Sequence, residues 1–361
     1  EKAYGLDRAA QGCDPQHPAV AADLATPDAP QGVLGLLTEA LRRRRAASLP
    51  PFTVLCCDNL PDNGALLRGA VVDFARRRDP ALAEWIAAEV AFPSTMVDRI
   101  TPAATEATRA EAAALTGCED LAAVETERFC QWVIEDHFPL GRPDWEAAGV
   151  IFTDDVSAFE AMKLRMLNGS HSMLAYAGFH AGAAYVRDVM ADAPLAALVR
   201  RHLTTAAATL PPIAGIDTGA YAEALLRRFE NPAIAHETFQ IAMDGSEKMP
   251  QRIFSAIPDA RRGGVSVRAF AFATAAWLRH VSGRTHDCAP YELRDPIAAR
   301  LQALAAGQDA SGIVAGLRET GLPPEPVARD AAFWDEVTEI LARMLSQPMA
   351  EVIAAEAAGA G

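Results

Sequence analysis

The sequence predicts an α/β region followed by a mostly helical region, and three observations support this prediction. Two short apolar runs, at 52–57 and 150–153, are each followed by a turn and an amphipathic segment, in the order strand, loop, helix. After about residue 158 the strand signals almost vanish, and Ala-rich amphipathic segments follow one another. A length of 361 residues also favours two domains, since about 150 residues is usual for one.

The first region shows its order in FTVLCCDNLPDNGALLRGAVVDFARRR, residues 52–78. The apolar run predicts a strand that ends at Cys57, the stretch from Asn59 to Gly64 predicts a turn, and the rest predicts a helix. A second strand is expected at 150–153, before a helix start in VSAFEAMK. Helical patterns before and between the two strands indicate crossover connections, so we expect a parallel sheet.

The charge balance argues against nucleic-acid and membrane partners. The formal net charge is −14, from 33 Lys and Arg against 47 Asp and Glu, and an acidic surface repels phosphate backbones and anionic lipids. The basic run at 42–45 suits the C-terminal end of a solvated helix, although a phosphate-binding patch is the alternative. No apolar run approaches the roughly 20 residues that a membrane span needs.

The six cysteines show neither CxxC spacing nor a regular framework, so a disulfide scaffold and a thiolate metal site have little support. The eight histidines show no paired ligand spacing either, and we expect no metal. Free thiols without a signal peptide fit a reducing cytoplasm.

The stretch KLRMLNGSHS, residues 163–172, carries more polar chemistry than a buried helix needs. If residues 159–174 form one helix, its 100° step brings an acid, an amine and an imidazole within roughly 80° of one another. These residues are Glu160, Lys163 and His171, with Asn168 about 60° further round.

Burial among apolar neighbours would lower the pKa of a lysine at position 163 and make it a general acid or base. A snorkelling lysine in an i,i+3 ion pair with Glu160 is the structural alternative. Gly169 costs about 1 kcal/mol relative to alanine in a helix, which indicates a packing or ligand reason for it.

Two other stretches add polar groups. CDNLPDNG presents Asp58, Asn59 and Asn63 beyond the carboxyl end of a predicted strand, where open α/β sheets bind ligands. A turn rich in Asx residues would use the same side chains. FPSTMVDRITPA holds Asp98 and Arg99 between two prolines, where an ion pair of purely structural use is the alternative.

These stretches, with QWVIEDHF, GRPDWEAAGV and IAMDGSEKMPQR, occur in the order of the signature blocks of the polyol-specific long-chain dehydrogenases, the mannitol dehydrogenase family. The chain resembles that family from about residue 30 to about 255. The resemblance implies a metal-independent NAD(H) enzyme that interconverts a secondary alcohol and a ketone. It also implies that residues 1–150 are the C-terminal part of a Rossmann-like NAD-binding domain and that residues 151–361 form a helical domain.

The resemblance implies a role for each residue of the catalytic set. Lys163 would be the general acid/base, and Glu160 would link it to solvent. Asn59 and Asn168 would donate hydrogen bonds to the substrate oxygen as it gains charge, an effect worth a few kcal/mol per donor. His171 would bind and orient the substrate.

Further residues would contact the substrate or the cofactor. Asp98 is expected near the site, and Asp98 and Asn59 are both expected to contact the cofactor. Lys248 would contact the substrate, and Gln240 stands where mannitol dehydrogenases tend to carry an arginine. The blocks look closer to the branch that reduces D-fructuronate to D-mannonate, and Lys248, Arg252 or Arg165 could supply the cation for that carboxylate.

One departure from the family concerns the cofactor. The sequence contains no G-x-G-x-x-G turn, and GVLGLL, starting at Gly32, has the wrong spacing and a helical pattern. We therefore expect a chain that lacks the segment holding the phosphate turn. A polyol dehydrogenase acting on mannitol is the nearest alternative function, and a non-catalytic protein that binds a sugar acid or a partner is another. The sequence does not indicate the oligomeric state, although many members of the family that it resembles are monomers.

Overall fold

The computed structural model describes residues 5–7, 10–213, 215–285 and 289–359, and the chain divides into two compact units. The first unit comprises Glu1–Arg99 and Arg128–Glu160, and the second comprises Ile100–Glu127 and Ala161–Gly361. The family-based domain boundary at residue 150 stays a prediction, because the units follow contacts in space and assign Ile100–Glu127 to the second unit.

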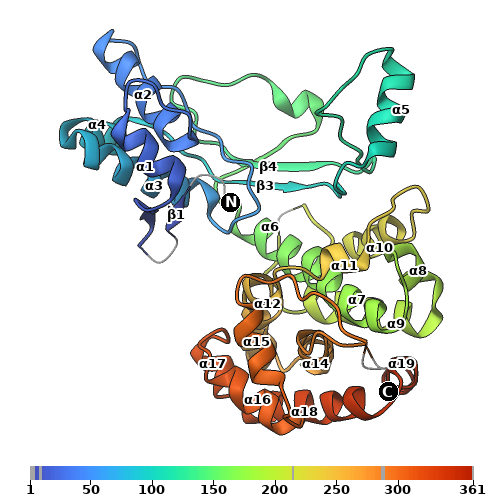
Figure 1. Ribbon diagram of the computed structural model, residues 1–361. Coiled ribbons are helices and arrows are strands. Elements are labelled where there is room, and N and C mark those ends of the chain that lie inside the picture. Colours follow the sequence, from blue (N-terminus) through green and yellow to red (C-terminus); the bar gives the residue numbers. More distant parts are fainter. Residues whose placement is uncertain (1–4, 8–9, 214, 286–288, 360–361) are drawn as a thin grey trace. The chain divides into compact units, whose positions relative to one another are not determined.

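The first unit combines short strands with helices (Figure 1). Its elements are β1 (Leu6–Asp7), β2 (Gly12–Cys13), α1 (Pro18–Ala25), α2 (Val33–Ala46), α3 (Asn63–Arg78), α4 (Pro80–Glu89), β3 (Thr95–Asp98), β4 (Gln131–Glu135), the 3-10 turn η1 (Trp145–Ala148), β5 (Ile151–Thr153) and the start of α6 (Ser157–Met162). Helix α3 packs against α2, α4 and β2. Its apolar residues Leu67, Val71 and Phe74 recur at helical spacing and are buried, as the sequence predicts for this helix.

The sheet of the first unit has the order β3-β4-β5. Strands β4 and β5 are parallel, whereas β3 pairs with β4 in antiparallel orientation, so the sheet is mixed and not purely parallel as predicted; of the two predicted strands, only the one at 150–153 takes part, as β5. The predicted strand at 52–57 is wrong: this segment joins no ladder, and the Val54 N–H donates to Ala91 O at 2.9 Å. Val54 and Cys56 are buried, which accounts for the apolar pattern without a strand.

The second unit is helical, which confirms the predicted class of this region. Its helices are α5 (Glu106–Thr116), the π-helical segment η2 (Lys163–Asn168), α7 (Gly169–His180), α8 (Val186–Ala191), α9 (Ala193–Ala207), α10 (Thr218–Phe229), α11 (Thr238–Ile241), α12 (Gly245–Arg252), η3 (Phe254–Ala256), α13 (Ile257–Arg262), α14 (Arg268–Val281), α15 (Ala298–Ala305), α16 (Ala310–Arg318), α17 (Glu325–Ala328), α18 (Ala331–Ser346) and α19 (Met349–Ala358). Helix α14 packs against α7 and α18 (Figure 1). Residues Ala269–Val281 of α14 are all buried, including the polar Thr274, Arg279 and His280, so this segment, predicted as amphipathic, lies in the core of the second unit.

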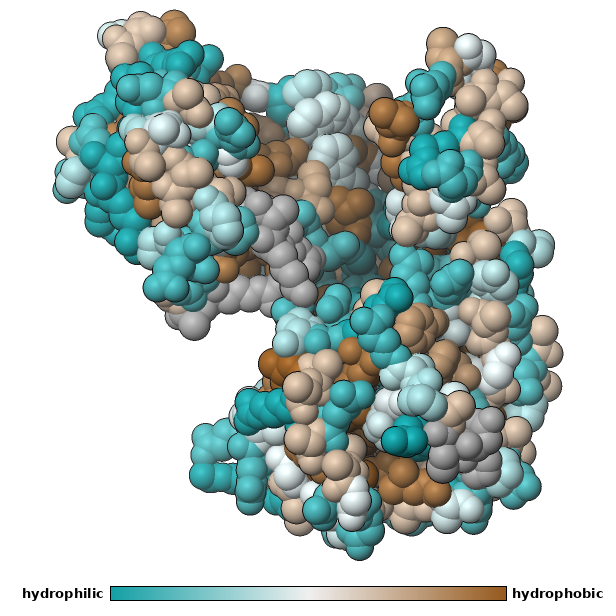
Figure 2. Space-filling model, viewed as in Figure 1, coloured by the Kyte–Doolittle hydropathy of each residue, from teal (hydrophilic) through white to brown (hydrophobic). Residues whose placement is uncertain are grey.

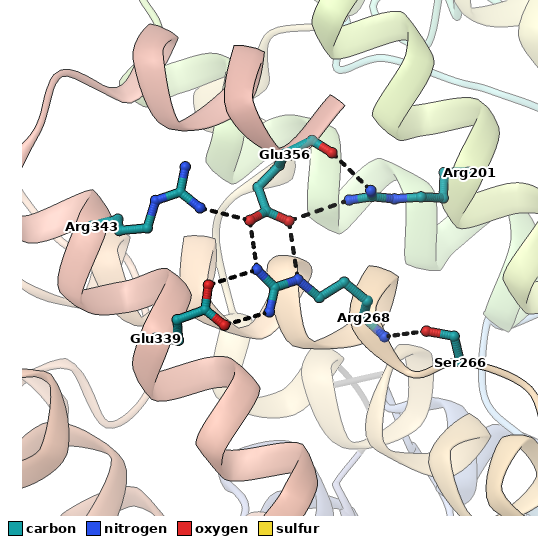
Figure 3. Close-up of polar contacts among 6 residues, drawn as sticks. All are labelled: Arg201, Ser266, Arg268, Glu339, Arg343 and Glu356. Atoms are coloured by element: carbon teal, nitrogen blue, oxygen red, sulfur yellow. Dashed lines mark hydrogen bonds and ion pairs between the residues drawn. The ribbon is translucent and has the colours of Figure 1, made fainter. Parts of the chain in front are cut away.

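An ionic cluster joins four helices of the second unit (Figure 3). The Glu356 carboxylate, on α19, accepts hydrogen bonds from Arg268 Nη2 at 2.7 Å and from Arg343 Nη1 at 3.0 Å. Arg201 Nη1 donates to Glu356 O at 2.9 Å, and Arg268 also pairs with Glu339. The Glu356 side chain is only 5% exposed, so this cluster anchors the last helix to the core.

The surface offers no support for the phosphate-binding alternative at 42–45. Arg42 and Arg43 both pair with Glu39, and the Arg45 guanidinium lies over the Trp85 ring. On the face drawn in Figure 2, hydrophilic and hydrophobic residues are interspersed over both units, as is usual for folded proteins. No helix within the described ranges is long and apolar enough to cross a membrane.

The cysteines described by the structure, Cys13, Cys56, Cys57, Cys118 and Cys130, are free thiols, and Cys288 lies outside the described residues.

Candidate active site

The polar stretch 163–172 lies on a continuous helical run formed by α6, η2 and α7. The run was predicted as one α-helix over 159–174, but Lys163–Asn168 form a π-helix. A π-turn is wider than an α-turn, so the 100° step and the angles derived from it do not hold across these six residues. Since π-helices are rare and often found at functional sites, this segment is a candidate site by geometry alone.

Lys163 is the first residue of the π-helix and is 8% exposed. Its neighbours Met162, Met166 and Leu167 are buried as well. A snorkelling lysine keeps its amine in water, and the burial of Lys163 argues against that part of the structural alternative. An amine in such surroundings is suited to exchange a proton with a bound substrate.

Gly169 has a packing reason. A Cβ at this position would lie 2.9 Å from His202 Nε2 and 3.1 Å from Arg252 O. The second neighbour is backbone, which cannot rotate away as a side chain can. Glycine therefore allows α12 to approach the helical run closely, directly after Asn168.

Glu160, in the first unit, is held by the backbone of another segment. The Asp62 N–H lies 3.1 Å from each carboxylate oxygen of Glu160. Asp62 has φ 53°, in the left-handed region, and its Oδ1 accepts a hydrogen bond from Ser94 Oγ at 3.1 Å. Burial raises the pKa of Glu160 to about 7, against the opposing effect of the Asp62 N–H. Glu160 can therefore take up and release a proton near neutral pH.

The three candidate residues at the loop before α3 differ in burial and in hydrogen bonding. Asn63 is 1% exposed, and its amide donates to Asp58 O and Thr95 O while accepting from the Thr95 N–H, each at 2.9 Å. Asn63 therefore fixes the loop, as the Asx-turn alternative anticipated. Asn59 is exposed and Asp58 is half-buried, so their side chains are the accessible ones of this loop.

Asp98 ends β3 and is fully buried, whereas Arg99 beside it is exposed. Glu160, Asn59 and Asp98 belong to the first unit.

His171 lies on α7 in the second unit and is 7% exposed. Its ring centroid is 4.7 Å from that of Phe229 and 5.4 Å from that of His236. Burial holds the pKa of His171 well below its usual value, and the neighbouring charges of Arg252 and Lys248 act in the same direction. The imidazole is therefore neutral at pH 7, with one nitrogen that donates and one that accepts.

The three candidate cations differ in their surroundings. Arg252 Nη1 donates at 3.2 Å to Oγ of Ser172, the last residue of the polar stretch 163–172, and Lys248 Nζ donates to Met243 O at 2.6 Å. Arg165 pairs with Asp259 at 2.7 Å and donates to Thr209 O at 2.9 Å.

Arg165 thus joins η2 to α13 and the end of α9, which is a structural task. Gln240 is half-buried in α11. The second unit therefore contains Lys163, Asn168, His171, Lys248 and Arg252 as its candidate site residues, together with Gln240.

Sequence reasoning missed Asp62 and His236. Asp62 lies within LPDNG, where a non-glycine residue in the left-handed region could have been suspected from the Asp-Asn-Gly run. His236, in NPAIAHETF, carries no local signal, because only its packing on His171 distinguishes it.

Neither a metal site nor a phosphate turn is found in the described part of the chain. No group of three or more His, Cys, Asp or Glu that could hold a metal occurs there. GVLGLL is not a phosphate turn: Gly32 caps α2, and a Cβ on Gly35 would collide with the Asp23 carboxylate and Pro30.

Comparison with protein families gives matches over most of the chain. Residues 5–147 match the mannitol dehydrogenase Rossmann domain, and residues 155–345 match the mannitol dehydrogenase C-terminal domain.

Two curated relatives come from Escherichia coli strain K12. The uncharacterized oxidoreductase YeiQ is 44% identical over 317 residues, which cover 88% of this chain and 65% of YeiQ. D-mannonate oxidoreductase is 41% identical over 357 residues, covering 98% of this chain and 74% of that protein. The chain thus spans about two thirds of the length of YeiQ.

Among solved structures, the ternary complex of Pseudomonas fluorescens mannitol 2-dehydrogenase with NAD and D-mannitol has a TM-score of 0.81 and 36% sequence identity. The match covers 94% of this chain and 69% of that one.

Proposed function

Because the chain belongs to the mannitol dehydrogenase family of oxidoreductases, which act on CH–OH groups, we propose that it reduces D-fructuronate to D-mannonate with NADH as the electron donor. The observation that carries the proposal is the buried Lys163 at the start of a π-helix whose run also bears Asn168 and His171. The likeness to D-mannonate oxidoreductase supports a sugar-acid substrate. The likeness to mannitol 2-dehydrogenase supports a polyol as the second candidate.

NADH, when bound, supplies the hydride that reduces the ketone. Asn59 and Asn168 carry amides that can donate hydrogen bonds to the substrate oxygen while negative charge develops on it. Lys163 delivers the proton to that oxygen and becomes a neutral amine. Glu160, with a pKa of about 7, returns a proton to the lysine from solvent. None of these reaction steps requires a metal.

The chain's contacts with the cofactor would come from Asn59 and Asp98. Asn59 is exposed and can reach a bound molecule, whereas the buried Asp98 would act from the end of β3.

The substrate carboxylate requires a cation. Lys248 and Arg252 are both half-buried and close enough to His171 to lower its pKa, so either can face a substrate bound there. Arg165 is the weakest of the three candidates, because Asp259 already neutralises its charge. Gln240, a neutral amide, can add a hydrogen bond but no charge. Free thiols at the described cysteines fit a reaction in the reducing cytoplasm, where we place it.

The test is NADH oxidation by the full-length gene product with D-fructuronate and D-fructose side by side, and Lys163→Ala as the control. Turnover of fructuronate that is lost in the variant is the expected result. Turnover of fructose alone would assign the protein to the polyol branch, and silence with both substrates would reject the proposed reaction.

A further inference from the structure

A small hollow lies in the second unit where α7, the end of α10 and the start of α8 meet the loop before α11. The empty space in this hollow and in the solvent at its mouth amounts to about 210 Å³, and its interior has room for little more than one water-sized group. Its walls include His171, Val186, Arg228, Phe229, Ile234 and His236. His171 lies about two helical turns after Lys163 on the same helical run, so the hollow adjoins the candidate active site.

Two buried imidazole nitrogens at this hollow are unsatisfied. His171 Nε2 and His236 Nδ1 have no hydrogen-bond partner among the residues that the structure describes. The rings meet edge to face, with an interplanar angle of 86°. Because buried polar atoms without partners are rare in native proteins, a missing partner of matching chemistry is indicated here.

A neutral hydroxyl group matches these two ring nitrogens in chemistry. Burial lowers the pKa of His236 to about 4, with the charge of Lys248 adding to the effect, and His171 is neutral for similar reasons. Each neutral ring has one nitrogen that donates and one that accepts, and a hydroxyl group both donates and accepts. A hydroxyl group placed between two neutral imidazoles can therefore satisfy both.

The only cation that lines the hollow, within the described part of the chain, is already matched by a carboxylate. Arg228 Nη2 and Nε donate to the two carboxylate oxygens of Glu127 at 2.7 and 2.9 Å. The two side chains are 7% and 4% exposed, so the pair is buried. An anion in the hollow would compete with Glu127 for Arg228. The remaining walls, such as Phe229 and Ile234, suit the C–H face of a carbon chain.

The loop that carries His236 is fixed before any ligand binds. The Val186 N–H donates to His236 O at 3.0 Å, and Tyr185 and Glu237 form an isolated β-bridge. The Thr238 N–H donates to Ala184 O at 2.9 Å. The imidazole is thus presented to the hollow by a backbone that is hydrogen-bonded on both sides of it.

We propose that this hollow is a subsite for a non-reacting hydroxyl group of the substrate, bound between His171 and His236. The inference rests on the proposed function in one respect, namely that the substrate carries several hydroxyl groups. It adds His236 as a residue that determines specificity, and it directs a substrate carboxylate away from the hollow, toward Lys248 or Arg252.

The first test compares His236→Phe, which keeps a ring against His171 without nitrogens, with His236→Asn, which retains a hydrogen-bonding group. His137→Asn, at an exposed position of the first unit, is the matched control. The loss of one net hydrogen bond corresponds to roughly a tenfold change in binding. We expect His236→Phe to raise KM for the sugar substrate about tenfold with kcat nearly unchanged, and His236→Asn to recover most of the loss.

An unchanged KM in His236→Phe would overturn the proposal, and so would a fall in kcat alone. A merely structural role would be revealed by an equal loss in both variants, together with altered circular dichroism.

The second test does not depend on turnover. Imidazole NMR resonances of His171 and His236 are followed while D-mannitol, and separately acetate, is added to the full chain. We expect both rings to shift with D-mannitol in the wild type, neither to shift with acetate, and the His171 response to weaken in His236→Phe. If no sugar is turned over but the shifts occur, the proposed reaction fails and the subsite stands. Absence of shifts with D-mannitol, or a response to acetate, would overturn the subsite.

Discussion

Two buried polar clusters of the second unit differ in how their polar atoms are satisfied. Around Glu356, both carboxylate oxygens accept from arginines, and the cluster joins helices that would otherwise depend on apolar contacts alone. Around His171, ring nitrogens of two histidines are buried without partners among the described residues, next to the π-helix that bears Lys163. The difference teaches that the fully paired Glu356 carboxylate holds helices together, whereas the unpaired nitrogens of His171 and His236 are still able to hydrogen-bond a ligand.

The largest effect is expected for Lys163, on the helical run that also bears His171. Lys163→Ala removes the proposed proton donor, and general acid–base catalysis contributes about 10²–10⁴-fold in rate. We expect kcat to fall by that factor in a protein that remains folded. Steady-state kinetics and calorimetry on the same preparation check this. Activity within about threefold of wild type would remove Lys163 from the mechanism.

In the Glu356 cluster, Glu356→Gln should lower the free energy of unfolding without changing the rate of the reaction. Removing one charge from a buried cluster leaves the arginines unmatched and costs about 3–5 kcal/mol. Denaturant unfolding measures this, and kcat per folded molecule should stay the same.

Glu339→Gln is the matched control, since the Glu339 side chain is 57% exposed and its pair with Arg268 should contribute less than about 1 kcal/mol. Equal losses in the two variants would contradict the role of burial.

Gly169→Ala tests the close approach between the helical run and α12. An alanine in a helix is normally about 1 kcal/mol more favourable than glycine, but here the Cβ would meet His202 Nε2 and Arg252 O. We expect a net loss of about 1–3 kcal/mol and a lower kcat. Gly263→Ala is the control, because φ is −83° there and the nearest neighbour lies at 3.4 Å. If Gly169→Ala leaves the free energy of unfolding unchanged, α12 can shift to make room for the added methyl group.

The smallest effect concerns Glu160, whose folded pKa of about 7 exceeds its ordinary value of 4.5. The folded state therefore binds more protons between these pH values, and the contribution of Glu160 to stability is present below pH 4.5 and lost as the pH rises through 7. Glu160→Gln should flatten that part of the melting-temperature curve and remove a titration near pH 7 from the kcat profile. Glu106→Gln, at an exposed position, should leave both curves unchanged. If Glu160→Gln instead keeps the wild-type decline in melting temperature, that decline belongs to another titrating group.

By itself, the sequence determined the helical character of the second region, helix α3 and the composition of the polar set. These are local properties: apolar spacing is sufficient to predict α3, and Lys163, Asn168 and His171 lie within ten residues of one another. The order of the signature stretches was also sufficient to indicate the family, which the comparisons confirmed.

Only the tertiary structure decided how these residues are used. The apolar run at 52–57 lacks a ladder, Asn63 is bonded to Thr95, and Arg165 is paired with Asp259. Gly169 follows the same rule, since it allows the close approach of Arg252 at the end of α12, and so does His236, which meets His171 across 65 positions of sequence. Each of these outcomes depends on contacts between segments far apart in the chain, and neither periodicity nor spacing within one segment encodes such contacts.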